Sequence, residues 1–222
     1  MKFNYATMKQ ILLTVVLAFT LQANAQDEIK KELEPICATF DSTYTLEGWK
    51  AKSDQLALVK GKYPENWMPA YYYAYSCIQM SYFEPTLAIK DALVDNAEEQ
   101  MGKIEACPLT DEVHIMKAMI ANARIGADPE NRWQKYGKIF DENLKSAKAI
   151  NENNPHIYLL KGISTFYTPK MFGGGAKNAK TYFDKAKVKY DLITYRDVDK
   201  PYWWGRSTCT YFFGEIDKEL NK

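Results

Sequence analysis

The chain has 222 residues, of which 46% are hydrophobic and 14% aromatic, with four cysteines, two histidines and a formal net charge of +1. This balance of charge excludes bulk electrostatic binding to nucleic acid or to an anionic membrane surface. The sequence contains no alternating runs of β-branched residues and is long enough for a substantial core, so it predicts a single all-α domain.

Residues 1–25 have the features of a secretory signal peptide. Two lysines precede an apolar run of 11 residues, Ile11–Leu21, which is too short to span a bilayer, and a small-x-small cleavage site ends at Ala25. An uncleaved membrane anchor is the alternative interpretation. We expect export to the periplasm, with residues 26–222 forming one domain and no stable membrane span after cleavage.

Apolar residues spaced three and four apart predict helices along the remaining chain, and prolines and capping residues mark their ends. The helix expected at 67–83 is the most aromatic and carries tyrosines on several faces, so it is either broadly buried or lines a surface. In chain order, the expected helices are 27–42, 46–63, 67–83, 85–106, 110–125, 130–150, 155–167, 176–190 and a last one ending near Leu220.

The segment 154–190 predicts a helical hairpin with an unusual turn. Asn154 is a good N-cap, Pro155 suits the first helical turn, and Pro169 requires the first helix to end near Tyr167. The turn then contains the run MFGGG, whose three glycines permit positive φ angles or a close approach of two backbones.

The second helix of this hairpin carries a small, large, small pattern at Ala179, Phe183 and Ala186. The alanines let a neighbouring helix approach, while the phenylalanine fills the space between helical pairs. This pattern resembles the second helix of a tetratricopeptide repeat. Leu144 precedes Phe183 by 39 residues, and Ala147 precedes Ala186 by the same number, so the repeat is longer than the usual ~34 residues.

The whole hairpin, with its YTP-x-MFGGG run, is similar to a group of small exported proteins of Bacteroidetes-type bacteria in which such a run closes a tetratricopeptide-like array. The resemblance implies a right-handed α-solenoid of about four helical hairpins with a C-terminal capping helix. It implies no established activity.

The glycine run Gly173, Gly174 and Gly175 is a candidate binding site for a phosphate or carboxylate at the start of the following helix. It is not a P-loop, because the G-K-[ST] ending and the preceding strand are both missing. The alternative is a structural turn that lets Phe172 tuck back against the hairpin.

A second candidate site is aromatic. Tyr71, Tyr75, Trp203 and Trp204 are predicted either to form a surface on which a peptide or sugar stacks, or to pack in the core.

The cysteines allow one disulfide hypothesis in an exported chain. Cys37 and Cys77 each lie ten residues into a predicted helix. If these are the first helices of adjacent hairpins, they run parallel and place the two cysteines at the same level along the helix axes, where they could form a disulfide. Buried free thiols are the alternative.

Catalytic and metal-binding signatures are missing from the sequence. The two histidines lie in no metal-binding spacing, and no C-x-x-C or hydrolase motif occurs. We therefore expect no metal, no cofactor and no enzymatic activity.

The favoured function is a periplasmic adaptor that presents a concave surface to an unknown protein or peptide partner. The alternative is a small-ligand-binding accessory protein in nutrient uptake. A long open groove would favour a peptide, and a closed cavity of ~300–1,000 Å³ would favour a small ligand.

Overall fold

The computed structural model describes residues 25–194 and 197–221. The predicted signal peptide lies almost entirely outside the described residues. Within those two ranges the chain is all-helical and forms no strand. None of the helices found there has the length and hydropathy that crossing a bilayer requires.

Most helices begin and end close to the predicted positions. The first, expected at 27–42, covers residues 25–37, and residues 40–42 form a separate 3-10 turn. The elements that follow are η1 (Phe40–Ser42), α2 (Leu46–Lys62), α3 (Trp67–Phe83), α4 (Leu87–Glu99), α5 (Met101–Ile104), α6 (Thr110–Ala127), α7 (Pro129–Ile150), α8 (Pro155–Tyr167), η2 (Lys170–Phe172), α9 (Ala176–Asp191), η3 (Pro201–Trp203) and α10 (Arg206–Leu220).

One predicted helix, 85–106, is wrong in both its start and its continuity. The Glu84 side chain accepts a hydrogen bond from the Thr86 N–H (3.1 Å), which turns the chain before α4 begins at Leu87. At Gln100 the backbone changes to bonds between residues three apart, with its N–H bonded to the Ala97 carbonyl. This tighter turn divides the segment into α4 and α5.

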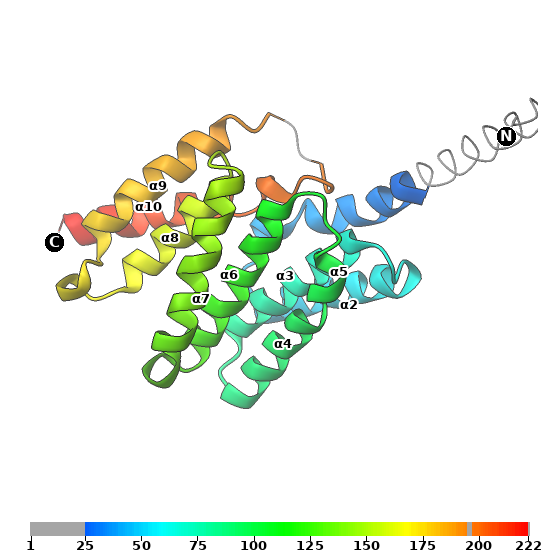
Figure 1. Ribbon diagram of the computed structural model, residues 1–222, viewed down its shortest axis with the longest axis horizontal. Coiled ribbons are helices and arrows are strands. Elements are labelled where there is room, and N and C mark those ends of the chain that lie inside the picture. Colours follow the sequence, from blue (N-terminus) through cyan, green and yellow to red (C-terminus); the bar gives the residue numbers. More distant parts are fainter. Residues whose placement is uncertain (1–24, 195–196, 222) are drawn as a thin grey trace, which may run out of the picture.

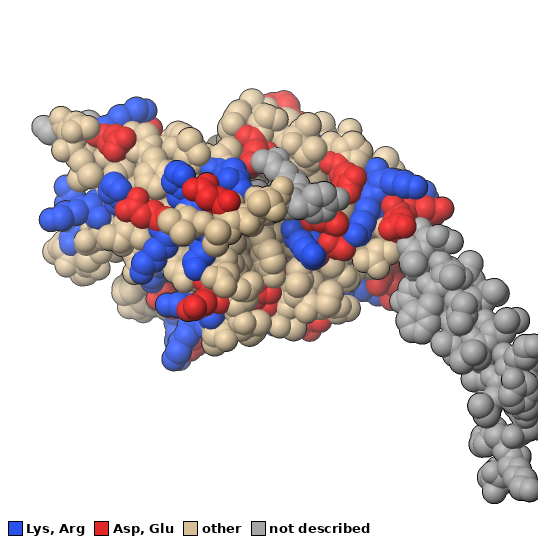
Figure 2. Space-filling model, turned by 90° about the horizontal axis from the view of Figure 1, so that it is seen from above, with Lys and Arg blue, Asp and Glu red and all other residues tan. Residues whose placement is uncertain are grey.

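Successive helices pack side by side across the molecule (Figure 1). Helices α2, α3 and α4 lie on the N-terminal side, α6 and α7 in the middle, and α8, α9 and α10 at the C-terminal end. Contacts of α3 with α6, and of α6 with α8, join these groups. Acidic and basic side chains are intermixed over the face shown in Figure 2, in keeping with a net charge near zero.

The small, large, small pattern packs as the sequence predicts. Ala179, Phe183 and Ala186 are all fully buried on α9. A Cβ placed on Gly162 of α8 would lie 3.0 Å from Cζ of Phe183, so the two helices approach closely where the glycine leaves room. Leu144, which precedes Phe183 by one predicted repeat, is also buried.

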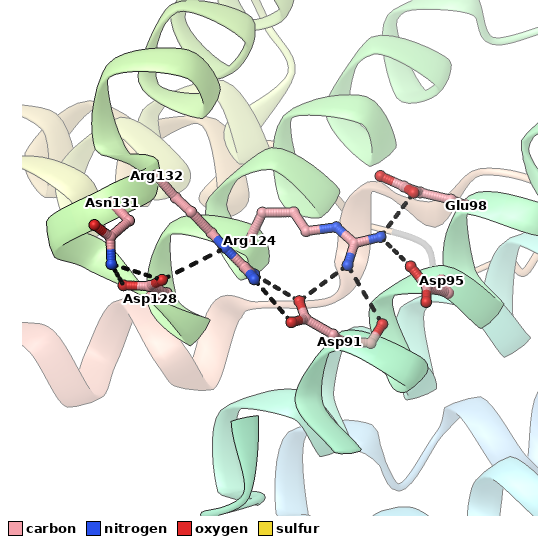
Figure 3. Close-up of polar contacts among 7 residues, drawn as sticks. All are labelled: Asp91, Asp95, Glu98, Arg124, Asp128, Asn131 and Arg132. Atoms are coloured by element: carbon pink, nitrogen blue, oxygen red, sulfur yellow. Dashed lines mark hydrogen bonds and ion pairs between the residues drawn. The ribbon is translucent and has the colours of Figure 1, made fainter. Parts of the chain in front are cut away.

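Two arginines join α4, α6 and α7 through shared carboxylates (Figure 3). The buried Arg124 guanidinium lies 3.1 Å from Asp91 Oδ1 and 2.8 Å from Glu98 Oε2, and it also contacts Asp95. Arg132 binds both oxygens of Asp91, with 2.8 Å between Nη2 and Oδ2. The hydrogen bond from Arg132 lowers the pKa of Asp91 below its ordinary value. This cluster fixes the position of α4 against the middle helices.

Candidate ligand-binding site

The predicted aromatic site is buried. Tyr71, Tyr75 and Trp204 are brought together, with the Trp204 Nε1–H donating to Tyr71 Oη (3.1 Å) and the Tyr75 and Trp204 ring centroids 4.7 Å apart. All three side chains belong to the core, so they form no surface on which a ligand can stack. The Trp203 backbone closes η3, and its side chain lies outside the described part of the structure.

A fully buried acid–histidine pair lies beside these aromatics. Oε1 of Glu112 accepts hydrogen bonds from Asn154 Nδ2 (2.6 Å) and from His156 Nδ1 (2.9 Å), and the Tyr71 hydroxyl bonds to Oε2. His156 Nε2 lies 3.0 Å from the Trp204 carbonyl oxygen, which can only accept. Both ring nitrogens therefore face acceptors, which fits an imidazolium paired with a carboxylate.

His156 and neighbouring side chains hold a connector, residues 197–205, across the starts of α6 and α8 and the first half of α3. The Val198 carbonyl accepts a hydrogen bond from Tyr72 Oη (2.8 Å), and the Tyr202 hydroxyl bonds to Asp111 Oδ2 (3.1 Å). The Trp204 indole stacks on the His156 ring at 3.5 Å between centroids. The chain itself thus covers these parts of α3, α6 and α8.

The glycine turn between α8 and α9 is held by its backbone. Gly173 and Gly175 have φ values of 83° and 87°, and a Cβ on Gly174 would lie 1.9 Å from the Thr168 carbonyl oxygen. A side chain would strain the backbone at Gly173 and Gly175 and would clash with the backbone at Gly174. The three glycine N–H groups donate to the carbonyls of Lys170, Pro169 and Thr165, at 3.0, 3.2 and 2.9 Å. The amides of the glycine run itself are thus already bonded within the turn and are not free to hold an anion.

The turn exposes large side chains instead of burying them. Phe172 is 74% exposed, so it does not tuck back against the hairpin, and Met171 and Tyr167 are 83% and 70% exposed. We call these three residues the corner surface. Pro169 ends α8 and η2 follows at once, so the chain reverses too tightly here to cover them.

A cavity of 340 Å³ lies beside the corner surface, between α8 and α9. This volume falls within the range of small-ligand pockets, ~300–1,000 Å³. The lining side chains are mostly hydroxyl-bearing or otherwise polar, and Phe172 joins the cavity to the corner surface. They are Lys161, Ser164, Thr165, Thr168, Phe172, Gly173, Asn178, Thr181 and Tyr182.

Among these residues, sequence reasoning identified Phe172 and Gly173 but missed the polar wall. Ser164 and Thr165 sit on an otherwise apolar helix, and Thr181 lies among lysines, so each alone is typical of an ordinary helix exterior. No spacing rule connects them, because they become neighbours only when α8 and α9 pair. Their density of hydroxyl groups was the one available signal.

The cysteine hypothesis is not realised in the structure. Cys37, Cys77, Cys107 and Cys209 are all free and buried, so Cys37 and Cys77 form no bridge. Burial raises the pKa of the Cys77 thiol to about 11. Across the described residues, no group of three or more His, Cys, Asp or Glu side chains is arranged to hold a metal ion.

Comparison with known proteins finds a similar fold in a bacterial haemophore. No family model matches the chain, and no curated protein matches it. Among solved structures the chain is similar to the HusA haemophore from Porphyromonas gingivalis, with a TM-score of 0.71 and 27% sequence identity. The match covers 87% of this chain and 93% of the HusA chain. P. gingivalis belongs to the Bacteroidetes, the group to which the YTP-x-MFGGG resemblance pointed.

Proposed function

We propose that the protein is an exported, non-enzymatic carrier that binds a small ligand of the porphyrin class and serves nutrient uptake from the periplasm. The observation that carries the proposal is the similarity to the HusA haemophore, which extends over 93% of that chain. A match of this extent includes nearly the whole helical scaffold, so a common type of ligand is a reasonable inference from it.

The corner surface supports the same proposal. A porphyrin is flat, largely apolar and too large to enter a 340 Å³ cavity completely. Met171 and Phe172 expose apolar side chains at this turn, and Tyr167 adds an exposed ring beside Phe212 of α10. A macrocycle can pack against such side chains. The adjoining cavity then accommodates only a substituent of the ring.

The arrangement of helices belongs to the proposal as well. We propose that the ordered pairs of helices form a right-handed solenoid of tetratricopeptide-like hairpins closed by α10. In such a scaffold the adaptor hypothesis requires an open groove along the first helices of the pairs. The connector 197–205 lies over that part of α3, α6 and α8, which favours the small-ligand alternative over the adaptor.

The test is an absorbance titration of haemin into the chain 26–222, beside a variant of the corner surface. Phe172→Ser is expected to weaken binding by about tenfold to a hundredfold, because burying one aromatic ring contributes roughly 1.5–3 kcal/mol. Leu58→Ser is the matched control, since Leu58 is 76% exposed on α2 at the far end of the chain. Absence of saturable binding by the native chain would overturn the proposal, and so would an equal loss in the Leu58 variant.

A further inference from the structure

The cavity between α8 and α9 contains hydrogen-bond donors that the protein does not use. The hydroxyls of Ser164 and Thr165 make no hydrogen bond to another group of the described residues, although Thr165 is only 9% exposed. Lys161 Nζ is 2.7 Å from Asp141 Oδ1, a contact that needs one of its three hydrogens. A cation and two hydroxyls on successive turns of α8 therefore face this space with donors to spare.

Three other polar side chains of the cavity, those of Thr168, Asn178 and Thr181, are already bonded. Thr168 Oγ1 donates to the Ser164 carbonyl (2.8 Å), and Thr181 Oγ1 donates to the Asn178 carbonyl (2.9 Å). Asn178 Nδ2 donates to the Gly173 carbonyl (3.0 Å), which fixes the turn against α9. These residues shape the wall, while Lys161, Ser164 and Thr165 remain able to bind a ligand.

The charge of the lining selects the kind of group that fits. The lining contains one ammonium, that of Lys161, which also pairs with Asp141 on α7, and it contains no carboxylate. A carboxylate accepts several hydrogen bonds at once, and bonds from an ammonium to it are stronger than those between neutral groups. An acidic substituent is therefore favoured over a neutral one.

We propose that this cavity is a carboxylate-binding subsite, in which Lys161, Ser164 and Thr165 hold one acid arm of the ligand. Phe172 borders both the cavity and the corner surface, so the acid arm and the apolar body of the ligand meet at this ring. The inference rests on the proposed function, and it adds that the bound molecule must carry a free acid.

Two measurements test the subsite. In the first, iron protoporphyrin IX and its dimethyl ester are titrated under the same conditions. The diacid is expected to bind at least fivefold more tightly than the diester, and the double variant Ser164→Ala, Thr165→Val is expected to remove most of that difference. Lys161→Met should do the same, whereas Lys177→Met, which changes an exposed lysine of α9 outside the lining, should leave it intact. Equal binding of diacid and diester by the native chain overturns the subsite.

The second measurement does not depend on porphyrins. Propionate and propionamide are titrated while the backbone amide signals of Thr165 and Thr181 are followed by nuclear magnetic resonance. The subsite is supported if these amide signals shift with propionate but not with propionamide, and if the shifts are lost in the Ser164→Ala, Thr165→Val variant. This result would support the subsite even if no porphyrin binds, and then only the proposed function fails. Equal responses to both compounds, or none, overturn the subsite.

Discussion

His156 on α8 and Glu112 on α6 face each other in the core with 2.9 Å between Nδ1 and Oε1, and both side chains are fully buried. The two residues stand 44 positions apart in the sequence. Their contact joins two helix starts, and the Trp204 carbonyl on the other side of the ring adds the connector to the same point. One imidazole thus links three separate parts of the chain.

Removing the charge of Glu112 should destabilise the fold strongly. Glu112→Gln leaves the buried His156 without its counter-ion, and breaking a buried pair in this way costs about 3–5 kcal/mol. The measurement is the free energy of unfolding from denaturant titration at pH 7. Glu142→Gln, at an exposed position of α7, serves as the control and should change it by less than about 0.5 kcal/mol. A loss below about 1 kcal/mol for Glu112→Gln would contradict the paired charges.

Alanine should have opposite effects at Gly174, in the glycine turn, and at Gly137, in the middle of a helix. Gly174→Ala places a Cβ 1.9 Å from the Thr168 carbonyl oxygen, so the turn must open and stability should fall by about 1–3 kcal/mol. Gly137→Ala, within α7 and with nothing near its Cβ, should stabilise by about 0.5–1 kcal/mol. Thermal unfolding of the two variants checks the pair, and a neutral Gly174→Ala would show that the backbone contact is not required.

The carboxylate of Asp91 should make stability depend on pH in the acid range. Hydrogen bonding to Arg132 lowers the pKa of Asp91 in the folded state. The stabilisation from this carboxylate is therefore complete above its pKa in the unfolded chain, about 4, and is lost as the pH falls through its pKa in the folded protein. Asp91→Asn should therefore be less stable than the native chain at pH 7, and the difference should shrink as the pH falls below 4. A difference that is constant between pH 7 and pH 2 would disprove this linkage.

The cysteines should be unreactive in the folded protein. Burial raises the pKa of Cys107 to about 12 and that of Cys209 to about 11, so almost no thiolate is present at pH 8. A colorimetric thiol reagent should react slowly with the native chain and with four equivalents after unfolding without reductant. Reaction of only two equivalents would instead support a disulfide bond, for which Cys37 and Cys77 are the candidates.

Local signals in the sequence account for most of the helices. Asn154 caps α8 as expected, and Asn66 caps α3 in the same way, with side-chain oxygens 2.9 Å from the N–H groups of His156 and Met68. The bounds of α3 were predicted without error because a cap opens it. Thr110, a residue type that favours the N-cap, is instead the first residue of α6, a difference of one position.

The connector could not be predicted from the sequence. Trp204 bonds to Tyr71, which is 133 residues away in the sequence, and Tyr202 bonds to Asp111, which is 91 residues away. No local periodicity of the sequence indicates such contacts. Acidic residues such as Asp111 and Glu112 are typical of an ordinary helix start, and their partners lie on other elements, where no local pattern indicates them. The glycine turn was recognised, since glycines carry their own signal, but the depth of the cavity beside it depends on how two helices pair.

The same long-range contacts determine how cooperatively the protein unfolds. In an array whose units touch only their neighbours, the terminal units fray first and unfolding proceeds in steps. Here Lys30, near the start of the described chain, lies 2.6 Å from Asp199 Oδ2, and the connector that carries Asp199 is bonded to α3, α6 and α8. The first and last parts of the fold are thereby tied together, so loss of one end loosens the other. This chain should melt in a single cooperative transition and resist trimming by proteases from either end.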